Sequence, residues 1–236
     1  MYEFLIELLI NILVAIFTFV AAKIYFGYKN FKGIKHAARL NKNCCSAGII
    51  NIFPDRKTYV QHKDHGTSGE YILKAEHDVI YIGFWLSSST ELGNLKTIIK
   101  KLVSQKKTVT LVFMNPNNNT SLVFFSQYVG ICAEDIKKRI LLVLKDLINF
   151  KKELPRDESR YLIIKVHNVL LSTSAFILDS TMIEKCRILL DYKIYNGSRE
   201  DSYGIEFEKR DKIITKKLYA SYKAIENDAE EIDDIN

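Results

Sequence analysis

His167 is the strongest candidate in this chain for a residue whose type and position could do chemistry. It ends the apolar run Leu162-Ile-Ile-Lys-Val-His167, which is typical of a strand, and strand ends in a parallel α/β sheet are where ligands bind. Asp179 closes the next apolar run, and Asp191 and Lys193 lie in the one after it. A histidine near a carboxylate can act as a nucleophile or a general base. We take His167 as the candidate catalytic residue, and the competing interpretation is a structural histidine bonded to the backbone.

The connection from Asp191 to Gly204 is rich in hydrogen-bond donors. Within it, Gly197-Ser198-Arg199 can present backbone N–H groups, a hydroxyl and a guanidinium to a phosphate, and Lys193 adds an ammonium. The alternative is a polar hairpin that needs glycine only for its turn. Lys193, Ser198 and Arg199 are therefore candidate ligand-binding residues.

A second cationic segment runs from Asn51 to Tyr59 and contains Arg56 and Lys57. It can fold over a phosphate-bearing ligand, and the alternative is a solvated loop. His62 and His65 follow with no third ligand nearby in the sequence, so no metal site is expected, and no other cofactor is expected either. The chain also lacks the glycine-rich nucleotide-binding, nucleophile-elbow and zinc-protease motifs.

The elements that must position these residues follow from apolar spacing. Continuous or alternating apolar runs predict strands, and apolar residues at helical spacing predict helices. The order predicts an α/β domain with parallel strands in its first half and antiparallel strands in its second. The predicted strands are Val79–Trp85, Thr108–Met114, Tyr161–His167, Ser174–Asp179, Cys186–Ile194 and Tyr203–Phe207, and the predicted helices are one ending at Tyr71–Glu76, then Leu92–Ser104, Leu122–Val129, Ala133–Lys152 and Arg210–Asn227.

The N-terminal segment from Phe4 to Ile24 predicts one transmembrane helix. It supplies about 20 largely apolar residues, enough to cross a hydrocarbon core, and it has no polar stripe at helical spacing. Glu3 and Glu7 at its start argue against the alternative of a cleaved signal peptide, and a buried core helix is the other alternative. The division we expect is a membrane anchor over residues 1–24, a basic juxtamembrane segment over 25–45, the α/β domain over 46–227 and an acidic, frayed tail over 228–236.

Basic residues follow this segment and none precedes it, so the positive-inside rule places the C-terminal domain in the cytoplasm and the N-terminus outside. The expected location is the inner membrane of a prokaryotic cell, with the lipid bilayer as one partner. Cys44, Cys45, Cys132 and Cys186 are scattered without metal-ligand spacing, which is typical of reduced cytosolic thiols.

The element order, together with a histidine that ends a strand in the second half, resembles one half of the phospholipase D superfamily. That resemblance covers about residues 46 to 207 and implies an α/β fold with a mixed sheet flanked by helices, here preceded by one transmembrane helix. The family motif is histidine, any residue, lysine, four residues, then aspartate. His167 stands in the histidine position, whereas Val169 and Ser174 stand where the family has lysine and aspartate. Lys165 and Lys193 are candidates to supply the missing charge from a different position.

The resemblance implies a phosphohistidine mechanism in complete members, and the two replacements put cleavage in doubt here. We expect a non-catalytic, membrane-anchored module that recognises a phosphate-containing ligand as a sensor or effector in prokaryotic defence. The alternatives are an active phosphodiesterase or nuclease with His167 as nucleophile, and a structural membrane scaffold. A nucleic acid is a further candidate partner.

Because a phospholipase D site lies between two halves and this chain has one, we also expect a homodimer. The predicted ligand pocket gathers cationic and hydroxyl donors at one end of the sheet. It consists of Arg56, Lys57, His167, Lys193, Ser198 and Arg199.

Overall fold

The computed structural model describes residues 38–61, 67–84, 89–195 and 201–234. The chain divides into two compact units, residues 1–45 and 46–236. Residues 38–47 are helical, and the rest of this section concerns the second unit. The predicted membrane span lies outside the described residues, and no helix within them is long and apolar enough to cross a membrane.

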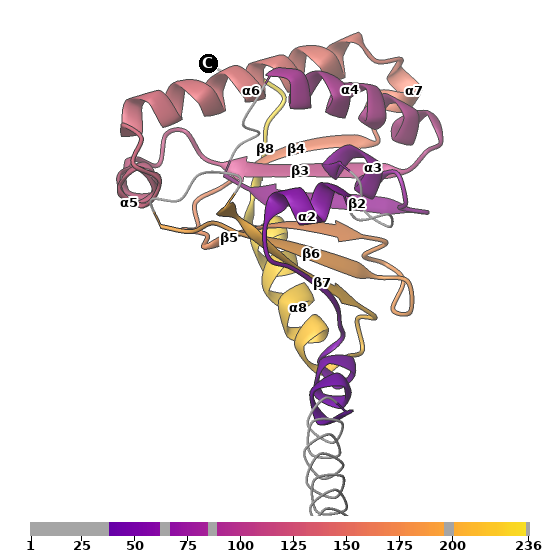
Figure 1. Cartoon of the computed structure of the whole chain (residues 1–236). Helices are drawn as coiled ribbons and strands as arrows, with labels where there is room; N and C mark the ends of the chain where they lie inside the picture. The colour runs from indigo at the N-terminus through magenta and orange to yellow at the C-terminus, as the bar shows by residue number, and fades with distance from the viewer. Residues whose placement is uncertain (1–37, 62–66, 85–88, 196–200, 235–236) are drawn as a thin grey trace, which may run out of the picture. The chain divides into compact units, whose positions relative to one another are not determined.

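One mixed sheet forms the centre of the second unit (Figure 1). Among the described residues its strand order is β1-β7-β6-β5-β2-β3-β4-β8. The neighbours β2, β3 and β4 are parallel, and all the other pairs are antiparallel. The strands are β1 (Ile49–Phe53), β2 (Asp78–Gly83), β3 (Thr108–Met114), β4 (Leu162–His167), β5 (Thr173–Leu178), β6 (Arg187–Tyr192), β7 (Tyr203–Glu208) and β8 (Glu230–Glu231).

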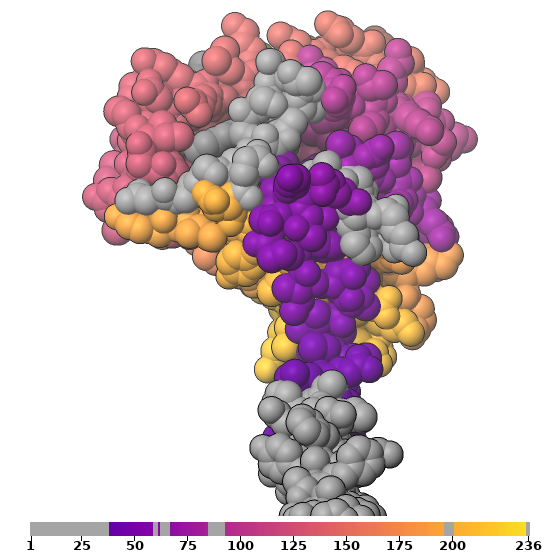
Figure 2. All heavy atoms as spheres, viewed as in Figure 1, coloured from indigo at the N-terminus to yellow at the C-terminus, as the bar shows by residue number. Residues whose placement is uncertain are grey.

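Helices cover both faces of this sheet (Figure 1). On one face α3, α4, α5 and α6 contribute to a large apolar cluster, whereas α8 packs on the other face. Helix α2 contacts β1 and β7 and lies at the surface facing the viewer in Figure 2. The helices are α2 (Arg56–Gln61), α3 (Ser68–Ile72), α4 (Ser89–Ser104), α5 (Asn119–Val129), α6 (Ala133–Glu153), α7 (Arg156–Ser159) and α8 (Ile213–Asp228).

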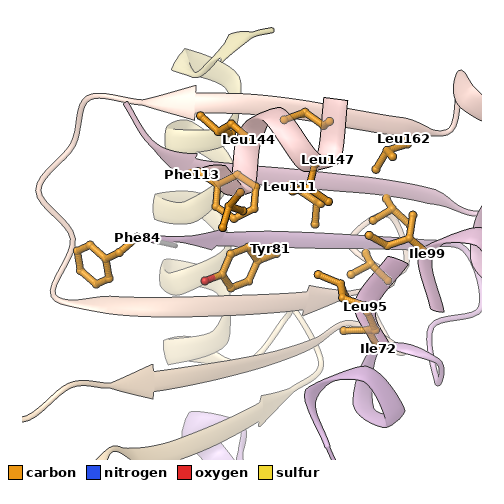
Figure 3. Packing of buried hydrophobic residues seen from close by; sticks show 14 of the residues in the cluster. Ile72, Tyr81, Phe84, Leu95, Ile99, Leu111, Phe113, Leu144, Leu147 and Leu162 are labelled. Atoms are coloured by element: carbon orange, nitrogen blue, oxygen red, sulfur yellow. The ribbon is translucent and has the colours of Figure 1, made fainter. Parts of the chain in front are cut away.

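The central strands are apolar throughout because both of their faces are buried. In β2, Val79 and Tyr81 join the cluster under α4 and α6, whereas Ile80 and Ile82 join the cluster under α8. Figure 3 shows Tyr81, Leu111 and Phe113 packed on the first of these faces, opposite Leu144 and Leu147 of α6. The alternation of side chains along each strand therefore builds two cores from one apolar run.

The predicted elements are confirmed with small shifts at their ends. β3 has the predicted bounds, and the mixture of parallel and antiparallel pairs follows the predicted order. Two parts differ from expectation. The segment predicted as a cationic loop forms β1 and α2, because Ile49–Phe53 adds to the edge of the sheet beside β7. The tail predicted to fray forms β8, which pairs with β4.

Candidate functional site

The site residues gather at the edge of the sheet where the parallel strands end. Gly83 ends β2 and His167 ends β4, while the antiparallel strand β5 begins at this edge and β6 ends there. The connection from β4 to β5 passes round the end of β2, where Phe84 lies (Figure 3). The chain crossings of a mixed sheet thus bring four separate segments to one edge.

His167 is buried at this edge, with only 2% of its surface exposed. Its Nε2 lies 3.3 Å from the carbonyl oxygen of Gly83, so in the neutral ring Nε2–H donates to that carbonyl and Nδ1 keeps the lone pair. Among the described residues Nδ1 has no hydrogen-bond partner. Burial lowers the pKa of His167, and the carbonyl groups of Gly83 and Val169 oppose this only in part. The imidazole is therefore neutral at pH 7.

The lowered pKa of His167 predicts a pH-dependent stability. Between the folded-state pKa and the unfolded value of about 6.5, the unfolded chain binds a proton that the folded chain does not. This contribution to stability is fully present above about pH 6.5 and is lost as the pH falls below that value. We expect the wild type to lose free energy of unfolding between pH 7 and pH 5 relative to His167→Gln.

Urea unfolding of both proteins at half-unit pH steps measures this difference. His77→Gln, at an exposed position, is the control for general effects of losing a histidine. A difference between wild type and His167→Gln that stays constant from pH 7 to pH 5 contradicts the prediction.

The two positions where the motif is incomplete lie in different surroundings. Val169 is 43% exposed and has no charge that could assist His167. Ser174 is buried, and its Oγ would lie 2.9 Å from a Cβ placed on Gly83. The same Cβ would approach the Tyr81 hydroxyl to 2.3 Å, so glycine is needed at this point. Ser174 thus borders the backbone that His167 contacts, without supplying a carboxylate.

A cationic cluster lies further along the same edge, around Asp191. The strand register places Asp191 directly opposite Ser174. The Asp191 carboxylate accepts from Lys193 at 3.0 Å and lies 3.7 Å from the Arg56 guanidinium, which α2 carries to this point. The Lys193 ammonium also lies 3.4 Å from the Ser202 hydroxyl. Two of the predicted cations therefore converge, and they share a carboxylate that an incoming anion must displace.

Asparagines that sequence reasoning missed organise the connection after His167. The Asn168 carbonyl accepts from the Asn118 side chain at 3.1 Å, and its Oδ1 accepts from Asn115 at 3.0 Å. The Asn118 side chain also accepts from the Ser121 backbone and so starts α5. At the other end of α5, Tyr128 donates to the Lys193 carbonyl. The run Asn115-Pro116-Asn117-Asn118 after a strand was the available signal.

Three other predicted contributors are placed differently. Asp179 lies at the opposite edge of the sheet, where its carboxylate accepts from the backbone of Glu76 and His77 at 2.8 and 2.7 Å. It cannot assist His167. Lys165, a candidate to replace the missing lysine, points to the α8 face and pairs with Glu226 at 2.9 Å. Lys57 is exposed on α2.

Some candidate residues lie outside the described part of the chain, namely Ser198, Arg199, His62 and His65. Ser198 and Arg199 belong to the connection between β6 and β7. Lys193 and Ser202, which lie near the two ends of that connection, are at the same sheet edge as His167. No cluster of potential metal ligands occurs among the described residues. The cysteines are free, and burial raises the pKa of Cys186 to about 12, so its thiol is protonated.

Two proteins are among the solved structures that are similar to this chain. One is a phosphatidylserine synthase from Haemophilus influenzae, with a TM-score of 0.48 and 12% identity over 70% of this chain and 36% of that one. The other is Nuc, a phospholipase D family member from Salmonella typhimurium, with a TM-score of 0.43 and 8% identity over 69% of this chain and 86% of that one. No protein-family model matches the sequence, and no curated protein matches it significantly.

Both TM-scores lie below 0.5 and both identities are 12% or lower, so the resemblance of the sequence to the phospholipase D superfamily stays a prediction. The second unit is a mixed α/β sheet with helices on both faces, and its histidine ends a strand at the carboxyl edge. The chain spans about a third of the synthase, 36% of its length. At these identities the likeness concerns the fold alone.

Proposed function

We propose that this chain is a phospholipase D-like module that binds a phosphate-containing ligand without cleaving it. The observation that carries the proposal is the state of His167. A nucleophilic histidine needs access to its substrate, whereas only 2% of the surface of His167 is exposed and its Nε2 faces the Gly83 carbonyl. Val169 and Ser174 supply neither the cation nor the carboxylate of the complete motif.

The spacing of the site favours an extended ligand over a lone phosphate ion. Gly83, which His167 contacts, and Asp191 lie on strands separated only by β5, so about 10 Å separates the two parts of the site at the usual strand spacing. A single phosphate cannot contact both. A phosphate ester with a further polar or charged group, such as a nucleotide, a nucleic-acid end or a lipid headgroup, has the required length.

One observation favours an active phosphodiesterase as the second candidate. The Nδ1 lone pair of His167 has no partner among the described residues, so it would be available as a nucleophile if the edge opened. In that case the cations around Asp191 would hold a more distant part of the substrate. A structural membrane scaffold is the third candidate, and it requires no ligand.

The test uses the purified full chain in detergent. Hydrolysis of bis(p-nitrophenyl) phosphate, a phospholipid and single-stranded DNA is measured for the wild type and for His167→Ala. We expect no hydrolysis by either protein, together with stabilisation of the wild type by a phosphate-containing ligand such as a nucleoside triphosphate. Hydrolysis that His167→Ala abolishes would establish the enzyme instead. Neither hydrolysis nor stabilisation would favour the scaffold.

The cations of the pocket give the sharper prediction. Arg56→Ala and Arg199→Ala should each weaken binding of the stabilising ligand by about 1.5–3 kcal/mol, the scale of a hydrogen bond to a charged group. Arg160→Ala is the matched control, because Arg160 precedes β4 at the opposite edge of the sheet. Isothermal titration measures the three affinities. An Arg199 effect of about 0–1 kcal/mol would indicate an exposed pair with Glu200 or Asp201 instead.

We further propose that two copies associate at this edge, with a two-fold axis near β4. Three segments there expose large apolar side chains, between 43% and 63% exposed, and α5 joins them by bonding to Asn168 at one end and to Lys193 at the other. An exposed apolar rim of this kind is typical of an interaction surface. This apolar rim consists of Val123, Phe124, Val169, Leu170, Ile194 and Tyr195.

Light scattering of the full chain in detergent tests the association. We expect a dimer at tens of micromolar for the wild type and a monomer for Phe124→Glu combined with Leu170→Glu, because buried charge at an interface is costly. Ile213→Glu, at a 65% exposed position on α8, is the control and should remain dimeric. A wild-type chain that stays monomeric at that concentration contradicts the proposal.

The location follows from the sequence. We propose a single span with the N-terminus outside and the domain in the cytoplasm, where the module would act as a sensor or effector in prokaryotic defence. A reporter fused after Asn236 should be active only if it requires the cytoplasm. Activity of a reporter that requires the periplasm would overturn the orientation.

A further inference from the structure

The acidic C-terminal segment Glu230–Asp234 lies along the outer edge of β4. Its two-residue strand β8 pairs antiparallel with Val166 and Lys165, and the Ile232 amide donates to the Ile164 carbonyl at 2.9 Å. β4 would otherwise be the last strand of the described sheet on this side. The segment therefore covers backbone groups that could pair with any other extended chain.

Few strong interactions attach this segment to the rest of the sheet. Lys151 of α6 pairs with Glu231 at 3.6 Å and with Asp233 at 2.7 Å, and Lys152 pairs with Asp234 at 3.5 Å. The three carboxylate side chains are 50–76% exposed, and ion pairs at such exposure contribute little. Ile232 is partly buried against the core. The segment is thus attached by a short ladder, one apolar side chain and screened charges.

The surface beside this segment extends beyond it along α6. A pocket continues from Asp234 along the outward face of the helix, where Lys138 and Lys145 flank the exposed side chain of Leu142. Leu141, Ile148 and Asn149 also line it. An extended chain with alternating acidic and apolar residues matches this lining in charge and in polarity.

We propose that the β4 edge and the basic outward face of α6 form a docking site for an acidic, extended segment of a partner protein. Residues 230–234 occupy the site as an internal competitor until such a segment displaces them. The partner segment would add a strand to β4 through backbone hydrogen bonds, place an aliphatic side chain where Ile232 packs, and place carboxylates on the α6 lysines. This site is separate from the phosphate-binding edge and does not depend on its function.

The test uses the full chain and a variant that stops after Ala229, which keeps α8 and the Lys165–Glu226 pair. The probe is a fluorescent peptide with the sequence of residues 229–236, Ala-Glu-Glu-Ile-Asp-Asp-Ile-Asn. We expect the truncated chain to bind this peptide at least tenfold more tightly than the full chain does. Added salt and the double change Lys151→Ala and Lys152→Ala should each weaken binding several-fold. A peptide with the same composition and a scrambled order should not bind.

Two further measurements keep the proposal open to refutation. Circular dichroism and thermal unfolding establish that the truncated chain is folded, and a folded chain that does not bind the peptide overturns the proposal. In the intact chain, hydrogen exchange should be at least tenfold faster at the Ile232 amide than in β3, because the segment opens without global unfolding. Equal exchange rates would identify a permanent strand and overturn the proposal. If truncation abolishes a dimer of the full chain, the occupant is the segment of a second copy, which overturns the assignment to a different protein.

Discussion

Phe113→Ala should lower the free energy of unfolding by about 3–5 kcal/mol, the usual cost of removing a buried phenyl group. Phe113 is fully buried in β3, and its ring centroid lies 5.6 Å from that of Tyr81. Tyr81 in turn packs on Phe176 at 4.8 Å, so the lost ring leaves a cavity in an aromatic cluster across three strands. Close packing from both sides of the cluster limits how far the cavity can collapse.

Urea unfolding of the wild type and the variant measures this effect. Ile183→Ala is the control, because Ile183 is 49% exposed between β5 and β6, and its loss should change stability by no more than about 0.5 kcal/mol. Phe113 precedes Met114, which stands opposite His167 in the strand register. Phe113→Ala should therefore also weaken ligand binding at the edge, whereas Ile183→Ala should leave it unchanged. Equal stability losses in the two variants contradict the assignment of the core.

Glu226→Met should lower the free energy of unfolding by about 3 kcal/mol, the lower end of the cost of breaking a buried ion pair. Lys165 on β4 donates to the Glu226 carboxylate and to its backbone carbonyl, both at 2.9 Å, and only 16% of the Lys165 side chain is exposed. Burial would raise the pKa of Glu226, but hydrogen bonds from Lys223 and Lys165 lower it, so the carboxylate is ionised. Removing it leaves the Lys165 ammonium under α8 without a counter-charge.

The reverse change should cost less. Lys165→Met leaves Glu226 paired with Lys223, which also donates to its carboxylate. The double variant with methionine at both positions should recover much of the loss, because no charge is then left unpaired in the interior. Glu76→Met removes an exposed pair with Lys185 and is the control, with a far smaller effect expected. A Lys165→Met loss larger than that of Glu226→Met contradicts this ordering.

The elements were predictable where local spacing carries the signal. β3 and α6 follow directly from apolar residues at strand and helix periods, because burial of those residues is what stabilises each element. β1 carried a local signal that sequence reasoning missed, because four of its five residues, Ile49–Phe53, are apolar. β8 was not predictable, because Glu230–Glu231 is a charged pair that becomes a strand only where the β4 edge offers unpaired backbone groups.

The candidate site was predictable in part. The positions of Arg56 and Lys193 could be proposed because donors interrupt apolar segments there, and the structure brings both to Asp191. The exclusion of Asp179 and Lys165 from the site could not be predicted. Asp179 stands at the far end of an antiparallel strand, and Lys165, two positions before His167 on β4, pairs with Glu226 of α8. The direction of β5 decides the first case and the packing of α8 decides the second, and neither is written in local composition.

The sequence by itself determined the class of fold, the order of the elements and the incomplete motif around His167, since each depends on residue type and spacing along the chain. Only the tertiary structure decided the state of that histidine. Whether an imidazole is charged and free to react depends on what surrounds it, and here the Gly83 carbonyl and the packing of separate strands make it buried and neutral. The same long-range pairing placed Asp191 beside Ser174 and the acidic tail on β4, because a strand's neighbours are set by the whole sheet rather than by nearby residues.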